Sequence, residues 1–86
     1  MIVSTNRVVA HEGRDYHIQA EDLGEAEASF EVRVYERGTV LWRRRLSYSE
    51  LVAKHLERLA FEDELRAQME KAAHTVEAAI LRGRLT

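Results

Sequence analysis

Apolar and polar residues alternate through the first half of the chain, which is the pattern of strands with one buried face. The alternation is clearest where Phe30, Val32 and Val34 are separated by charged residues. Polar segments, each containing a glycine, separate this run from its neighbours and favour hairpins between consecutive strands. The sequence therefore predicts an antiparallel meander of three to four strands over residues 1–46, with the runs 3–10, 16–21, 30–35 and 40–46 as its strands.

The last of these turns determines which side chains of the final two strands share a face. A two-residue turn would place apolar Val32 opposite Arg43 and mix the faces. A three-residue loop, with Gly38 in the left-handed conformation of a bulge, places Val32 opposite Trp42. It also places Glu31 opposite Arg43 on the solvent side, where opposite charges pair favourably. We therefore predict the three-residue loop.

In the second half of the chain the apolar spacing becomes helical. Ser47 and Glu50 fit a capping box, in which the Ser47 hydroxyl accepts a hydrogen bond from the Glu50 amide. A first apolar stripe follows but is interrupted by charged residues, and a second stripe begins about 100° away around the axis. Two helices meeting near Ala60–Phe61, or one bent helix, resolve this conflict. With Gly83 as C-terminal cap, residues 47–83 are predicted to be helical.

The 86 residues are expected to form one α+β domain, with the helical region packed on one face of the sheet. A second helix of about 21 residues would be roughly 32 Å long and would overhang strands of roughly 20–26 Å. Val76, Ile80 and Leu81 would then be exposed in a monomer, and a homodimer joined through this helix would bury them. The alternative is a helix that folds wholly onto its own sheet. The predicted dimer interface is the second stripe, Phe61, Leu65, Met69, Ala72, Val76, Ala79 and Ile80.

Charge is unevenly distributed, although the formal net charge is only −2. Residues 31–58 carry seven basic and four acidic side chains, so a charged partner, in particular an acidic one, would bind in this basic middle. A nucleic-acid site on the last hairpin would use Arg33, Arg37, Arg43 and Arg45 beside Trp42. The competing interpretation is a core Trp42 with a solvated, partly paired arginine face, because strand alternation places Arg44, not its two neighbours, on the Trp42 side. We favour that second interpretation.

Residues capable of chemistry form no recognisable catalytic set. The chain has no cysteine, which excludes thiolate metal sites and thiol nucleophiles, and its four glycines are isolated. Glu70, His74 and Glu77 share one helical face, so a carboxylate–histidine metal site would need a dimer to double the set. A solvated helix face with ion pairs is the competing interpretation. We expect no enzymatic activity, no cofactor and no metal.

The expected function is therefore one of contact between proteins. No apolar run approaches the roughly 18 residues of a membrane span, and no basic segment precedes an apolar leader, so we expect a cytoplasmic protein without membrane contact. Eleven arginines against two lysines, with abundant alanine, are typical of GC-rich bacterial genomes. The leading hypothesis is a non-enzymatic protein–protein interaction domain that acts as a homodimer and has an unknown protein partner. A nucleic-acid-binding module is the alternative.

Overall fold

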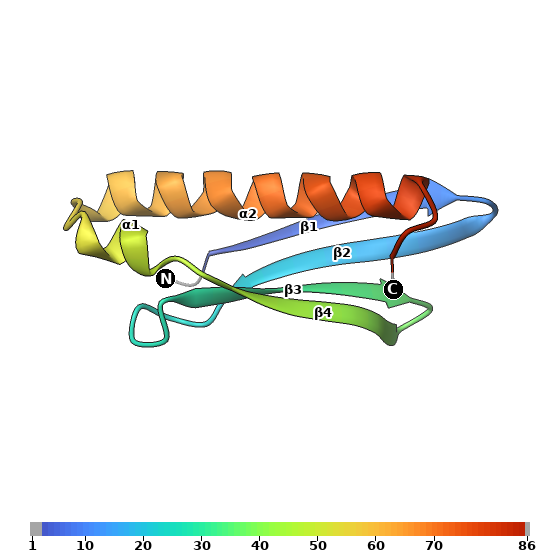
Figure 1. Cartoon of the computed structure of the whole chain (residues 1–86), viewed down its shortest axis with the longest axis horizontal. Helices are drawn as coiled ribbons and strands as arrows, with labels where there is room; N and C mark the ends of the chain where they lie inside the picture. Colours follow the sequence, from blue (N-terminus) through green and yellow to red (C-terminus); the bar gives the residue numbers. More distant parts are fainter. Residues whose placement is uncertain (1–2, 86) are drawn as a thin grey trace.

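A computed structural model describes residues 3–85 as a four-stranded antiparallel sheet followed by two helices (Figure 1). The strands lie in the order β1-β2-β3-β4, so each one pairs with its neighbour in the sequence. The predicted α+β meander, with two helices after the sheet, is confirmed. The elements are β1 (Ser4–His11), β2 (Arg14–Asp22), β3 (Ser29–Glu36), β4 (Thr39–Ser47), α1 (Ser49–Ala53) and α2 (Arg58–Leu81).

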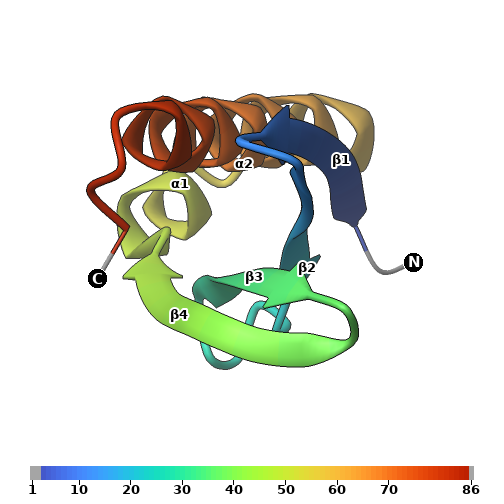
Figure 2. The same cartoon turned by 90° about the vertical axis from the view of Figure 1, so that its right-hand side faces the viewer.

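Helix α2 runs lengthwise along the sheet (Figure 1), and the molecule is correspondingly elongated, with extents of 44 × 20 × 19 Å. The sheet curls, so that β1 lies beside α2, while β3 and β4 lie on the far side of the concave interior (Figure 2). Helix α2 packs chiefly on β1, β2 and β3, and the short α1 packs against α2. Strand β4 lies at the opposite edge of the sheet from β1, and α2 therefore covers it least.

The hydrophobic core fills the concave side of the sheet beneath α2. From the sheet, Ile18, Val32 and Val34 are at most 1% exposed, because alternate positions of β2 and β3 face inward. From α2, Leu65 and Met69 are fully buried against them. Burying side chains of this size contributes about 2 kcal/mol each, which makes this interior the main source of stability.

The apolar stripe of α2 forms part of this core, which corrects one expectation. Val76 is 7% and Ile80 is 3% exposed, and only Leu81, at 50%, is left open at the end of the helix. The expected overhang is wrong at this end because the C-terminal end of α2 lies over the β1–β2 hairpin (Figure 1). The strands have 8 to 9 residues and span about 26–30 Å, against about 36 Å for the 24 residues of α2. The excess length of the helix lies at its N-terminal end, beside α1.

The turn between β3 and β4 has two residues, not the predicted three. Arg37 and Gly38 both have positive φ, 53° and 79°, as a type I′ hairpin turn requires. The faces are nevertheless consistent, because a bulge follows: Tyr35 lies opposite Val40 but Val34 lies opposite Trp42, which leaves residue 41 without a partner. The bulge shifts the later pairs, so that Val32 faces Arg44 instead of Trp42 and Glu31 faces Arg45 instead of Arg43.

The helix boundaries also differ from those predicted. The capping box is wrong: the Ser47 hydroxyl accepts from the Ser49 amide, and α1 ends after only five residues. His55, with φ of 52°, then reverses the chain, and α2 begins where the Glu57 carboxylate accepts hydrogen bonds from the amides of Leu59 and Ala60. This leaves Leu59 exposed instead of in an apolar stripe.

The C-terminal end of α2 agrees with the prediction. Gly83 adopts a φ of 67°, a conformation that costs glycine little. Its amide donates to the Ile80 carbonyl and the Arg84 amide donates to the Ala79 carbonyl, which is the Schellman arrangement. The cap turns the following residues back toward the sheet (Figure 2).

Candidate functional site

The predicted nucleic-acid residues lie on the convex face of the last hairpin, and two of the four are engaged by acids. Arg33 is 24% exposed, and its Nη2 lies 2.8 Å from Glu21 Oε1 while its Nε lies 3.5 Å from Glu31 Oε1. Arg45 Nη2 lies 3.0 Å from Glu27 Oε2. These glutamates cancel much of the charge that a phosphate backbone would need.

The remaining two arginines of that set are farther from acidic side chains. Arg43 and Arg37 are exposed, and within residues 3–85 neither forms an ion pair. They do not sit together, because Arg37 is in the turn and Arg43 is in the middle of β4. The structure therefore divides the predicted patch into two neutralised positions and two separate free ones.

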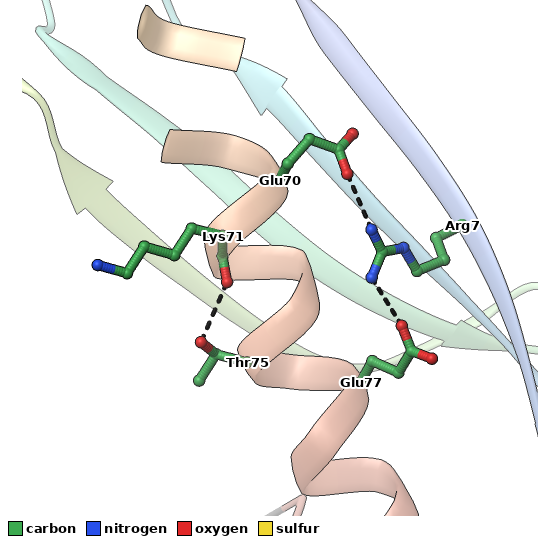
Figure 3. A network of polar contacts seen from close by, with 5 residues as sticks. All are labelled: Arg7, Glu70, Lys71, Thr75 and Glu77. Atoms are coloured by element: carbon green, nitrogen blue, oxygen red, sulfur yellow. Dashed lines mark hydrogen bonds and ion pairs between the residues drawn. The ribbon is translucent and has the colours of Figure 1, made fainter. Parts of the chain in front are cut away.

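The acidic face of α2 serves a structural contact. Arg7, on β1, inserts its guanidinium between two carboxylates of α2: Nη1 donates to Glu77 Oε1 at 2.6 Å and Nη2 donates to Glu70 Oε2 at 2.8 Å (Figure 3). The bond to Glu77 raises the pKa of Arg7 above its ordinary value, although burial opposes the rise. His74 lies exposed on the same helix. Among the described residues, no three His, Cys, Asp or Glu side chains are grouped as a metal site would require.

A groove of about 670 Å³ lies between β4 and α2, where the helix does not cover the last strand. Trp42 and Leu46 face it from the inner side of β4, and both are only partly buried. Ala72 and Ala79 face it from α2, and their small side chains leave the space open. The apolar part of the lining is Phe30, Val32, Trp42, Leu46, Ala72, Val76, Ala79 and Leu85.

The charged groups around this groove, which we call the β4–α2 groove, are all cationic. Arg44 projects from β4, Lys71 from α2 and Arg84 from the segment after α2. None of the described residues that line the groove carries a carboxylate. Within residues 3–85, Arg44 and Lys71 form no ion pair, and Lys71 points away from the Arg7 cluster on the opposite side of the helix (Figure 3). The groove thus combines an apolar floor with unneutralised positive charge.

The alternation of β4 predicted that Trp42 and Arg44 share one face but did not indicate a groove. One signal was present in the alternation of β4: Arg44 lies between Trp42 and Leu46, at an inward position where a core strand carries an apolar residue. An arginine there indicates that this part of the inner face is open to solvent. Lys71 was a weaker indication of the groove, because a single lysine on a helix is common.

The structure leaves the predicted α2 dimer stripe with few exposed atoms. Its large members, Phe61, Leu65, Met69, Val76 and Ile80, are at most 7% exposed, because they pack on the chain's own sheet. Only Ala72 and Ala79 retain part of their surface. Of the predicted stripe, therefore, only Ala72 and Ala79 could contribute surface to an association of two copies, and self-association stays a prediction.

Within residues 3–85, neither helix has the length and apolar character needed to cross a bilayer. Comparison with protein-family models, with curated proteins and with solved structures finds no match to this chain.

Proposed function

We propose that this domain acts by binding another polypeptide in the β4–α2 groove, without catalysing a reaction. The single observation that supports this proposal most is the combination in one place of partly exposed Trp42 and Leu46 with unpaired Arg44 and Lys71. A tryptophan next to an arginine in a concave, apolar site is the composition of an interface centre. A groove of this size accommodates several side chains of a partner.

A polypeptide fits this site better than a nucleic acid. The arginines on the convex face that would bind phosphates are partly neutralised by Glu21, Glu27 and Glu31. The groove itself offers only a few cations around an apolar interior, whereas nucleic-acid surfaces need a continuous array of phosphate contacts. The nucleic-acid module remains an alternative that the experiments below can distinguish.

The homodimer of the leading hypothesis has less structural support than the groove, because the apolar stripe of α2 that suggested it lies in the core. Light scattering at micromolar concentration tests it directly: a dimer mass would support self-association, and a monomer mass at all concentrations would exclude it. The proposed binding function does not depend on that result.

The proposal can be tested with ten-residue peptides selected from a random displayed library against the whole protein. Trp42 is the only tryptophan, so its emission reports directly on the groove. We expect selected peptides to shift this emission and to lose binding when Thr75, an exposed residue of the groove wall, is changed to phenylalanine.

The matched control is Ala67→Phe, which adds a similar volume at an exposed position of α2 outside the groove. Peptides should bind this variant as they bind the unchanged protein. If the selected peptides leave Trp42 emission unchanged, or bind Thr75→Phe as well as Ala67→Phe, the groove is not the binding surface and the proposal is refuted.

A further inference from the structure

Strand β4 forms one edge of the sheet and borders the β4–α2 groove from Trp42 to Ser47. It pairs with β3 on one side, and within residues 3–85 no segment hydrogen-bonds to its other side. Its nine residues, about 30 Å of extended chain, therefore present a row of backbone donors and acceptors to solvent. Such a row is where a partner in extended conformation adds to a sheet.

The middle of β4 is protected against pairing with a second copy of itself. Arg43, Arg44 and Arg45 are consecutive, so an antiparallel pair of β4 strands centred on Arg44 would place Arg44 opposite Arg44 and Arg43 opposite Arg45. Like charges directly opposite each other destabilise strand pairing. Arg43 and Arg44 form no ion pair within residues 3–85, and Arg45 is paired only with Glu27, whose side chain is 61% exposed. The three arginines would therefore attract a strand that carries acidic residues at the facing positions.

The side chains of β4 specify the order of residues in such a strand. Trp42, Arg44 and Leu46 face the groove, while Arg43 and Arg45 face the convex side. A strand paired with β4 would place apolar residues next to Trp42 and Leu46. It would place acidic residues next to the three arginines that lie between Trp42 and Leu46 in the sequence. The complementary pattern is apolar–acidic–acidic–acidic–apolar, and it is symmetric, so it fits in either strand direction.

We propose that the partner polypeptide is an acidic, extended segment of this pattern, which adds to β4 as a fifth strand and inserts its apolar side chains into the groove. This inference rests on the proposed function and specifies the partner's chemistry. Lys71, across the groove on α2, supplies a further cation for the acidic residue next to Arg44. The one run of this pattern in the chain itself, Phe61–Leu65, lies in α2 with both ends buried. A second folded copy therefore does not present it as a strand, and the partner is a different chain.

The test uses a ten-residue peptide with both termini chemically blocked. Its centre is valine, three glutamates and valine, and threonines on both sides favour extended structure and solubility. We expect it to shift Trp42 emission and to protect alternate amides of β4 from hydrogen exchange. Replacing Arg44 by glutamate should weaken binding about tenfold or more, because an attraction becomes a repulsion. The control Arg66→Glu changes the charge equally at an exposed site of α2 outside the groove and should have little effect.

Two further peptides test the strand geometry and the charge. N-methylation of alternate backbone amides removes the donors of one edge and should abolish binding if the segment pairs with β4. A version with three glutamines should bind at least tenfold more weakly than the glutamate peptide. If the N-methylated or glutamine peptide binds as tightly as the parent, or Arg44→Glu behaves like Arg66→Glu, the inference is refuted.

The outcomes separate this inference from the proposed function. If the glutamate peptide does not bind, while selected peptides of other composition shift Trp42 emission and are blocked by Thr75→Phe, the acidic strand is overturned but the groove remains a binding surface. Complete failure of both peptide sets to affect Trp42 would overturn both proposals. Single-stranded DNA that binds more tightly than the glutamate peptide, with a loss of affinity in Arg44→Glu, would assign the groove to nucleic acid and overturn them as well.

Discussion

Arg7 joins β1 to α2 through two carboxylates, and its replacement by methionine measures how strongly this contact holds the helix on the sheet. Methionine retains an unbranched apolar stem of similar reach but has no charge and no donors. The Arg7→Met change therefore removes both hydrogen bonds of the cluster in Figure 3 with little loss of packing. It also leaves Glu70 and Glu77 without their shared cation.

The size of the effect follows from exposure and geometry. The side chains of Arg7 and Glu77 are each 30% exposed and that of Glu70 is 48% exposed, so solvent screens the cluster only in part. Fully exposed pairs contribute 0.2 to 1 kcal/mol, roughly, and short hydrogen bonds between charged groups lie at or above the upper end of that range. For two such bonds we expect a loss of about 1.5 kcal/mol in the free energy of unfolding, which lowers Tm by about 8 °C in a domain of this size.

The assay is urea unfolding followed by circular dichroism, with Arg14→Met as the matched control. Arg14 is 63% exposed and its Nε lies 3.5 Å from Glu36 Oε2, so this second replacement should cost less than about 0.5 kcal/mol. Raising the salt concentration to about 1 M should narrow the difference between the Arg7 variant and the unchanged protein. A double-mutant cycle with Glu77→Gln isolates the coupling between the two side chains.

Either of two results would show that the Arg7 cluster does not stabilise the docking of α2 on β1. One is an Arg7→Met variant that loses no more stability than Arg14→Met. The other is a coupling free energy with Glu77 below about 0.3 kcal/mol, which would mean that the short bond is offset by the cost of desolvating the two charges.

Three other changes test separate parts of the structure. Tyr48→Phe removes the bond that the Tyr48 hydroxyl donates to Asp22 Oδ1 at 2.6 Å, and should cost about 1.5 kcal/mol in urea unfolding. Burial, with the bond to Asp22, raises the pKa of Tyr48 above its ordinary value of 10.0. The contribution of the hydroxyl to the free energy of unfolding is therefore complete below pH 10 and decreases as the pH rises further. If the stability of Tyr48→Phe changes with alkaline pH in the same way as that of the parent, this expectation is contradicted. Relative to its quenching of free tryptophan, iodide should quench Trp42 emission more strongly than caesium does, and Arg44→Glu should remove or reverse that difference. Equal relative quenching by the two ions in the parent would mean that the groove is not electropositive. Arg37→Asn should stabilise the domain by a few tenths of a kcal/mol, because asparagine accepts the φ of 53° in the turn more readily; a loss of stability would show that the arginine side chain has a role of its own.

The arrangement of the sheet was predictable because alternate burial leaves its period in the sequence. Phe30, Val32 and Val34 show this most clearly, and all three are buried. The turn that follows could not be predicted only from which side chains share a face of the sheet. A three-residue loop and a two-residue turn followed by a bulge both keep the apolar residues of the two strands on one face, although their registers differ. The choice between them depends on the backbone at Arg37 and Gly38.

The helical region shows a similar limit. The change of phase between two apolar stripes predicted either two helices or one bent helix, and the structure has two. The break lies at His55–Glu57, several residues before the predicted position. There, capping by Glu57 outweighs the apolar spacing of Leu56 and Leu59. The groove was harder still to predict, because it depends on the angle at which α2 crosses the sheet, and no local pattern records that angle.

The meander topology has a consequence for the order in which the chain folds. Every strand pair joins neighbours in the sequence, whereas the contact between Arg7 and Glu77 closes a loop of 70 residues. Closing a long loop is entropically costly, so local hairpins form before distant contacts do. We expect the docking of α2 on β1 to come late, after the transition state. The Arg7→Met variant should then unfold faster while its refolding rate remains nearly unchanged.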